Sequence, residues 1–267
     1  MRRLRLVVGY RGTRYAGWAS QPPRQSAGRP TLQSIVQDAL AAALGHPVHA
    51  QCAGRTDAGV HADGQVISFE TTSSMPAAGL AACLGRWLPD DVWLVSADEA
   101  EFAFDARRSA LRRWYRYVIW RAPERPPSAW QGRCLVLRTP LDVMAMRAAS
   151  HLLLGRHDVA AFATNPAAGR STIRTIYAAD WLACGEPPSL LLFEVCADAF
   201  LKQMVRTLVG SLLWVGSGRW SVDHFGTVLL SADRRQAGPV APAVGLSLHR
   251  IEYPRSTPTH AHHPEDL

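Results

Sequence analysis

The sequence predicts an α+β fold in which two similar lobes share a mostly antiparallel central sheet covered by helices. Two observations support this fold class. Strand-like and helix-like segments alternate along the 267 residues, and both halves of the chain repeat a similar order. Several connections between strands are too short for the right-handed crossovers that parallel neighbours need. We expect a cleft between the lobes, and such a cleft is the natural place for an active site.

The first half of the chain contains the predicted elements of an N-terminal lobe. Residues 4–10 have the composition of a strand. A loop rich in proline and glycine follows, and apolar residues at helical spacing then predict a helix over 32–44 with Thr31 as its N-cap. The other elements expected here are a strand at 64–71, a short helix around 76–87 and a strand at 92–96.

The second half repeats this order and contains the strongest helical pattern of the chain. Apolar residues recur at i, i+3 and i+4 for over three turns, from Leu201 to Leu213. Another helix is expected to follow Asp142 and to end at Gly155, because glycine often terminates helices. The other expected elements are strands at 113–120, 175–183, 190–197 and 244–253 and a short helix near 222–231.

The two halves meet near residues 105–112, which sets the predicted domain boundaries. We expect an N-terminal lobe of residues 1–108 and a C-terminal lobe of residues 109–253. Residues 254–267 are polar and contain three prolines, so we predict a flexible tail there.

The charge balance favours an anionic partner. Lys and Arg number 29 against 22 Asp and Glu, which gives a net charge of +7 and an isoelectric point near 9.6. Nucleic acid is the first candidate for a partner of such a chain. All of the basic residues except Lys202 are arginine, however, and genomic base-composition bias would produce the same excess. Charge alone therefore does not choose between these interpretations.

Cysteine usage and hydropathy argue against a secreted or membrane protein. The five cysteines are odd in number and form no C-x-x-C pair, which favours a reduced, cytoplasmic compartment over a disulfide framework or a zinc site. The most apolar stretch, 201–215, contains Lys202, Gln203 and Arg206 and is not expected to span a membrane. The apolar segment at the N-terminus stops at Arg11, too early for a signal peptide.

Residues 52–62, Cys-Ala-Gly-Arg-Thr-Asp-Ala-Gly-Val-His-Ala, combine a carboxylate, a guanidinium, a hydroxyl and an imidazole. Gly54 and Gly59 bracket the polar residues, so the backbone can turn tightly and a ligand can approach it. Taken alone, a glycine-rich loop around an aspartate is more often a turn held by an Asx hydrogen bond than an active site.

Six motifs in order along the chain resemble the TruA family of tRNA pseudouridine synthases. The resemblance extends over about residues 4–253 and is strongest at Gly54-Arg55-Thr56-Asp57-Ala58-Gly59-Val60-His61, which resembles the active-site signature of the family. The other motifs are Tyr10-x-Gly12-x-x-Tyr15-x-Gly17-Trp18, Phe104-Asp105-Ala106-Arg107, Arg113-Trp114-Tyr115-Arg116-Tyr117, the helical Phe200-Leu201-x-x-Met204-Val205-Arg206-x-x-Val209-Gly210, and Gly245-Leu246-x-Leu248.

The resemblance implies a specific activity and a specific fold. Members of the family isomerise uridine to pseudouridine at positions 38, 39 and 40 of the tRNA anticodon stem-loop. They have a pseudouridine synthase fold of two lobes, act as homodimers and use no cofactor or metal. The aspartate of the signature, here Asp57, would be the essential catalytic residue.

The resemblance also assigns roles to residues outside the aspartate position. Arg206 would lie against Asp57, and Tyr115 would stack on the extruded uracil or hydrogen-bond near it. Arg55 would fill the gap left by the flipped base or pair with phosphate, whereas Thr56 and His61 are expected to shape the loop. The candidates for contacts with tRNA phosphates and 2′-hydroxyls are Arg14, Arg107, Arg113, Arg116 and Arg174.

Two departures from the family pattern keep other functions open. Arg11 stands where the family usually has Asp, and Ala19 stands where it usually has Gln. Both lie in a region linked to RNA contact, which motivates the alternative of a non-catalytic tRNA-binding protein on the same scaffold. A third alternative is a glycosidase that uses Asp57 and Asp63 as a carboxylate pair.

Overall fold

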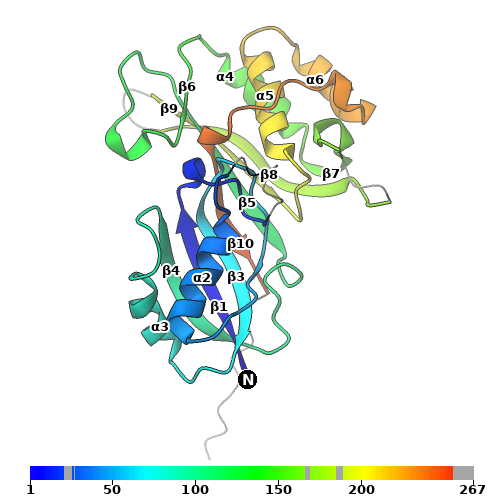
Figure 1. Ribbon diagram of the computed structural model, residues 1–267. Coiled ribbons are helices and arrows are strands. Elements are labelled where there is room, and N and C mark those ends of the chain that lie inside the picture. The colour runs from blue at the N-terminus through cyan, green and yellow to red at the C-terminus, as the bar shows by residue number, and fades with distance from the viewer. Residues whose placement is uncertain (21–25, 27, 166–168, 185–188, 255–267) are drawn as a thin grey trace, which may run out of the picture.

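A computed structural model describes residues 1–20, 26, 28–165, 169–184 and 189–254 (Figure 1). The strands are β1 (Arg2–Tyr10), β2 (Gln51–Cys52), β3 (His61–Thr71), β4 (Val92–Ala100), β5 (Arg112–Trp120), β6 (Leu135–Val136), β7 (Gly155–Asp158), β8 (Ile173–Cys184), β9 (Leu190–Ala197) and β10 (Leu246–Glu252). The α-helices are α2 (Leu32–Leu44), α3 (Ala77–Leu84), α4 (Val143–His151), α5 (Met204–Gly216) and α6 (Val222–Ser231). Short 3-10 helices include η1 (Gly12–Arg14), η2 (Ser128–Trp130) and η5 (Ala243–Gly245).

The strands form one sheet with the order β4-β1-β3-β10-β5-β9-β8-β7, while β2 pairs with β3 and β6 pairs with β5. Within the described residues, β10–β3 and β5–β6 are parallel and the other pairs are antiparallel. The α+β class with a mostly antiparallel sheet is therefore confirmed. The sheet is continuous across the predicted lobe boundary at 108/109, because the late strand β10 lies between β3 of the first half and β5 of the second.

Several predicted elements agree closely with the structure. The helix predicted at 32–44 is α2, and the Thr31 hydroxyl accepts a hydrogen bond from the Ser34 N–H at 3.3 Å, which confirms the N-cap. The strand predicted at 190–197 is β9 with the same bounds. These segments were predictable because capping and hydrophobic periodicity are local signals.

The predicted boundaries of two helices were wrong, and three short strands were not predicted. The helix after Asp142 ends at His151, and Gly155, with φ of 102°, begins β7 instead of ending the helix. The helix predicted from Leu201 begins at Met204, because Gln203 adopts a left-handed conformation with φ of 59°. The short strands β2, β6 and β7 were not predicted, since two to four residues are too few to show a periodic pattern. Residues 255–267 of the predicted tail lie outside the described residues.

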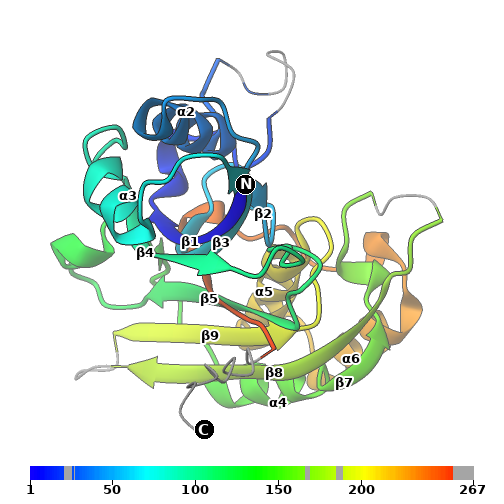
Figure 2. The same ribbon diagram turned by 90° about the horizontal axis from the view of Figure 1, so that it is seen from below.

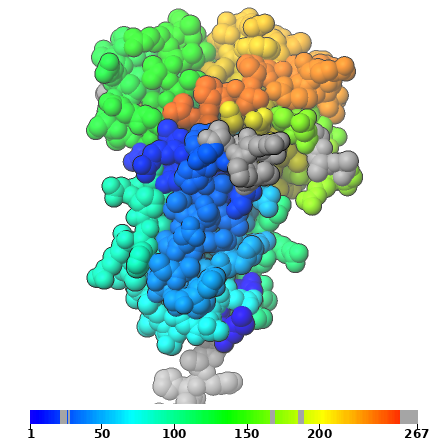
Figure 3. Space-filling view, viewed as in Figure 1, coloured from blue at the N-terminus to red at the C-terminus, as the bar shows by residue number. Residues whose placement is uncertain are grey.

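Helices pack against the sheet in two groups. In Figure 2, α2 and α3 lie together beside β1, β3 and β4, whereas α4, α5 and α6 contact one another on the part formed by the second half. Buried side chains from both groups join the sheet in one large core that includes Tyr117, Phe193 and Trp181. The space-filling view shows the two masses stacked, blue to cyan below and green to orange above (Figure 3).

Among the described residues, every helix is too short or too polar to span a lipid bilayer.

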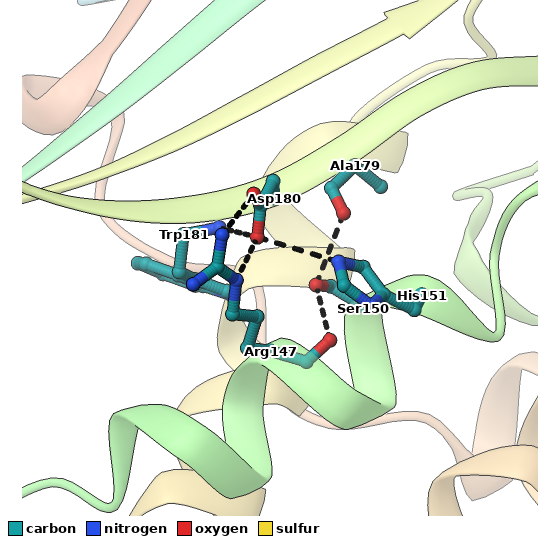
Figure 4. Close-up of polar contacts among 6 residues, drawn as sticks. All are labelled: Arg147, Ser150, His151, Ala179, Asp180 and Trp181. Carbon is teal, nitrogen blue, oxygen red and sulfur yellow. Dashed lines mark hydrogen bonds and ion pairs between the residues drawn. The ribbon is translucent and has the colours of Figure 1, made fainter.

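A polar cluster attaches α4 to β8 (Figure 4). Asp180 accepts two hydrogen bonds from Arg147, from Nε at 2.7 Å and from Nη2 at 2.8 Å, and His151 Nε2 lies 3.4 Å from the same carboxylate. The Ser150 hydroxyl donates to the carbonyl oxygen of Ala179 at 3.1 Å. Burial alone would raise the pKa of Asp180, but the hydrogen bonds from Arg147 and from the Trp181 N–H lower it below its ordinary value.

We expect Asp180→Ala to lower the melting temperature by roughly 2–4 °C at neutral pH, since it removes the bidentate pair that joins α4 to β8. Because the pKa of Asp180 is lowered in the folded state, this stabilisation is complete above the ordinary carboxyl pKa and is lost as the pH falls below it. Thermal unfolding between pH 7 and pH 3 measures both effects. The matched control is Asp98→Ala, which removes an exposed ion pair with Arg5 and should change little.

Candidate active site

The loop between β2 and β3 carries the aspartate that the sequence predicted to be catalytic. Its side chains alternate in exposure: Thr56 is buried, whereas Arg55 is exposed and Asp57 is half-buried. The Val60 N–H donates to the Asp57 carbonyl oxygen at 3.2 Å, and Gly59 has φ of 79°, a conformation that favours glycine in a turn. The loop thus presents two charged side chains outward while it buries the residue between them.

The glycines of the opening motif let the backbone approach this loop. A Cβ atom at Gly12 would lie 1.9 Å from the carbonyl oxygen of Val60, and one at Gly17 would lie 2.7 Å from that of Thr56. Gly17 also has φ of 101°, and the next N–H, of Trp18, donates to the Thr56 carbonyl oxygen at 3.0 Å. The opening motif therefore supports the Asp57 loop, a role that its sequence did not reveal.

His61 closes the other end of the loop. Its Nδ1 accepts a hydrogen bond from the Gly12 N–H at 3.2 Å, and its Nε2 lies 3.1 Å from the carbonyl oxygen of Val244. The side chain is buried, and burial lowers the pKa of His61 below its ordinary value. A neutral imidazole that donates to Val244 fits both contacts, so His61 joins the end of the loop to the Gly12 N–H and to the Val244 carbonyl oxygen.

Arg206, in the first turn of α5, reaches Asp57 from the second half of the chain. Its Nη1 lies 3.4 Å from Asp57 Oδ2, while its Nε donates to the carbonyl oxygen of Ala241 at 2.8 Å. The Ala241 N–H in turn donates to the Arg206 carbonyl oxygen at 3.0 Å. Arg206 is therefore held from two directions beside the carboxylate, in the arrangement that the sequence analysis expected.

Tyr115 on β5 lies behind the same loop. Its hydroxyl oxygen would lie 3.8 Å from a Cβ atom at Gly54, and its ring meets the Phe200 ring edge to face at 5.0 Å. Burial, together with the negative charge of Asp57, raises the pKa of Tyr115 well above its ordinary value. Tyr115 is thus a buried, neutral phenol whose hydroxyl lies close to the loop at Gly54.

Arg113, one of the predicted RNA contacts, uses its guanidinium to bind four backbone carbonyl oxygens of the protein. It donates to the carbonyl oxygens of Asp198 at 2.5 Å, Arg107 at 2.8 Å, and Ala53 and Ala110 at 3.3 Å. Desolvation lowers the pKa of Arg113. The structure therefore gives Arg113 a structural role, joining the start of the Asp57 loop to the segment before α5.

The remaining predicted RNA contacts do not converge on one site. Arg14 and Arg107 are exposed, and Arg14 forms an ion pair with Asp91 at 2.7 Å. Arg174 is half-buried and donates to backbone carbonyl oxygens of its own segment. Arg55 is exposed and has no ion pair among the described residues, so its guanidinium is available beside Asp57.

Arg116 and Asp63 belong to the opposite face of the sheet. Neighbouring strand residues alternate in direction, so Arg116 points away from the face that Tyr115 occupies, and its Nε donates to Glu194 at 2.6 Å. Asp63 pairs with Arg133 at 2.9 Å and accepts from the Ser247 hydroxyl at 2.9 Å. These side chains line a separate cavity of about 110 Å³.

This separation removes the geometric basis of the glycosidase alternative. Asp63 has its own partners on a different face, and Asp57 pairs with Arg206. The two carboxylates therefore do not form the facing pair that glycoside hydrolysis requires. No group of three or more His, Cys, Asp or Glu side chains suited to a metal ion occurs within the described ranges.

The fold and site define a class of protein: an α+β enzyme scaffold that presents a half-buried carboxylate beside a guanidinium and a neutral phenol. Residues 149–254 match the family model described as tRNA pseudouridine synthase. The chain is 39% identical over 257 residues to tRNA pseudouridine synthase A of Pelobacter propionicus, covering 95% of this chain and 100% of that protein. It is 43% identical over 258 residues to the protein of that name from Chloroflexus aurantiacus, covering 95% and 90%.

The chain belongs to the tRNA pseudouridine synthase family. A crystal structure of the archaeal box H/ACA sRNP Nop10–Cbf5 complex is also similar, with 13% identity and a TM-score of 0.35 over 90% of this chain and 61% of that one. That likeness is too distant to support an inference, whereas the relatives of about 40% identity cover almost the whole chain.

Proposed function

We propose that this protein isomerises uridine to pseudouridine at positions 38, 39 and 40 of the tRNA anticodon stem-loop, with Asp57 as the essential catalytic residue. The observation that carries the proposal is the contact between Asp57 and Arg206, which come from opposite halves of the chain. The family membership of the chain supports tRNA pseudouridine synthase activity. The resemblance of residues 54–61 to the TruA signature supports the narrower choice of uridines.

The reaction conserves every atom of the uridine. The C1′–N1 bond breaks, the uracil rotates, a C1′–C5 bond forms, and C5 loses a proton while N1 ends protonated. No redox step or external nucleophile is needed, but a carboxylate must lie beside C1′ or C6. Asp57 could attack one of these carbons or deprotonate an intermediate, and each route uses the same carboxylate in the same place.

The neighbours of Asp57 fit this chemistry. Arg206 forms an ion pair with the Asp57 carboxylate and holds it in place. Tyr115, kept neutral by its raised pKa, can donate a hydrogen bond to a uracil carbonyl or stack against the base. Since uridines inside a stem must leave the stack to react, the exposed Arg55 is placed to fill the gap or bind a phosphate. Arg14 and Arg107, which are exposed, are candidates for phosphate contacts farther from Asp57.

Tritium release from tRNA labelled at uridine C5 tests the proposal, because C5 must lose its hydrogen when it becomes the glycosidic carbon. We expect release from unmodified tRNA and none from a transcript in which positions 38–40 contain no uridine. Salt-dependent tRNA binding without release would instead indicate a binding protein. Liberation of free uracil would indicate a hydrolase, since an isomerase retains the base.

A homodimer and a cytoplasmic location belong to the same proposal. The homodimer rests on the family resemblance, and the location rests on the cysteine usage and hydropathy of the sequence. We expect sedimentation at micromolar concentration to give twice the mass of the 29.2 kDa chain. A monomer under these conditions would contradict the dimer while leaving the proposed reaction open to its own test.

A further inference from the structure

The Asp57 loop rests on a buried polar network that includes a side chain outside the six family motifs named above. Gln65 on β3 is fully buried. Its side-chain amide forms hydrogen bonds with both the backbone N–H and the backbone carbonyl of Gly54. The Gly54 N–H donates to Gln65 Oε1 at 3.3 Å, and Gln65 Nε2 donates to the Gly54 carbonyl oxygen at 2.5 Å. One residue earlier, the Ala53 N–H still donates to the Val66 carbonyl oxygen at 2.8 Å. The Gln65 side chain therefore continues the hydrogen bonding of β2 with β3 at the point where the loop leaves the sheet.

Tyr10, the last residue of β1, extends this network to the middle of the loop. Its hydroxyl lies 2.8 Å from Thr56 Oγ1 and accepts from Gln65 Nε2 at 3.4 Å. The Tyr10 side chain is fully buried, and desolvation raises the pKa of Tyr10 far above its ordinary value. The neutral Tyr10 hydroxyl thus connects Thr56 of the loop with Gln65, which holds Gly54.

The network contacts alternate residues of the Asp57 loop. Gly54 and Thr56 are the residues held from below, while Arg55 and Asp57 alternate with them and point outward. Tyr10, Gln65 and Thr56 are buried at 0%, 0% and 6% exposure, so none of their side chains is available to a substrate. Removal of one partner leaves a buried donor or acceptor without its bond, which is costly and loosens what it supports.

We propose that Gln65 and Tyr10 are positioning residues that hold the Asp57 loop in its reactive geometry. The inference deepens the proposed function and depends on it for the effect on turnover. A displacement of about 1 Å of a reacting group can reduce a rate on the order of 100-fold, although the displaced group itself is unchanged. Affinity for tRNA should change little, because phosphate contacts spread over the protein supply most of the binding.

The test compares Tyr10→Phe and Gln65→Met with Tyr253→Phe. Tyr253 is the matched control because its hydroxyl donates to a backbone carbonyl, that of Ala106 at 2.7 Å, and does not support the loop. Hydrogen exchange of the amides at 55–59 and the steady-state constants for tRNA are measured for each variant. Tyr10→Phe removes one oxygen atom and keeps the ring, so it remains informative if Gln65→Met does not fold.

We expect Tyr10→Phe and Gln65→Met to speed exchange across 55–59 by about tenfold and to lower kcat by roughly 10- to 100-fold, with KM changed by less than about threefold. Tyr253→Phe should match the wild type in both measurements. Unchanged exchange in Tyr10→Phe would overturn the proposal, and so would faster exchange with unchanged kcat. If the wild type makes no pseudouridine, the proposed function fails separately, and the exchange measurement still decides whether the network holds the loop.

Discussion

Asp57→Ala should abolish tritium release from C5-labelled tRNA, with a rate at least about 1,000-fold below that of the wild type. A loss of this size corresponds to roughly 4 kcal/mol of transition-state stabilisation. The reason is that, among the described residues, the Asp57 carboxylate is the one that pairs with Arg206, and its negative charge also raises the pKa of Tyr115. Affinity for tRNA should stay within roughly tenfold, or about 1.4 kcal/mol, because phosphate contacts supply most of the binding.

Two further variants belong to this experiment: Asp57→Asn tests the charge of the carboxylate, and Asp63→Asn is the control. The first keeps the size and an acceptor oxygen for Arg206 but lacks the charge, and we expect it to be as inactive as the alanine variant. The second removes a carboxylate of the opposite sheet face, which pairs with Arg133, and it should retain most of the activity. Normal pseudouridine formation by either Asp57 variant would show that the catalytic assignment is wrong.

Arg206→Ala is expected to have the second largest effect, lowering kcat by about 100-fold, or roughly 2.7 kcal/mol. The substitution removes the partner of the Asp57 carboxylate and also frees the 237–243 segment that Arg206 holds through Ala241. Steady-state kinetics with unmodified tRNA measure the loss, and circular dichroism shows whether the fold is kept.

Arg206→Lys separates the charge of Arg206 from its geometry. A lysine keeps the positive charge, but one ammonium group cannot reproduce the separate Nε and Nη1 contacts to Ala241 and Asp57. We therefore expect the lysine variant to recover only a small part of the activity. Arg235→Ala, which alters an exposed arginine with 90% side-chain exposure, is the control and should behave as the wild type. Full activity in Arg206→Lys would show that charge alone is needed.

Local signals predicted some parts of this molecule well. The Thr31 cap and the periodic apolar residues of α2 specify that helix without help from the rest of the chain. By contrast, the sequence predicted that the helix after Asp142 runs to Gly155, because a glycine there fits a helix end. In the structure the helix stops at His151 and Gly155 opens β7, whose pairing with β8 is a tertiary contact.

The candidate site likewise combines features that the sequence predicted with features that only the structure showed. The motif at 54–61 identified Asp57, and the helical motif identified Arg206, which the structure places at its carboxylate. Arg113 and Arg116 lie in one predicted strand, and the sequence analysis named both as candidates for RNA contact. The structure separates them, because Arg113 binds backbone carbonyls around the loop and Arg116 points to the opposite face. Burial and the direction of a side chain depend on the neighbouring strands, which a motif does not describe.

The sequence by itself determined the family, the fold class and the carboxylate on which the proposed reaction depends, since these follow from motifs, composition and local periodicity. Only the tertiary structure showed that Gly12 and Gly17 support the Asp57 loop, that Gln65 and Tyr10 hold it from below, and that Asp63 lies on another face. The physical reason is that these contacts join residues far apart in the chain. Their geometry is set by strand pairing and close packing, which no local pattern specifies.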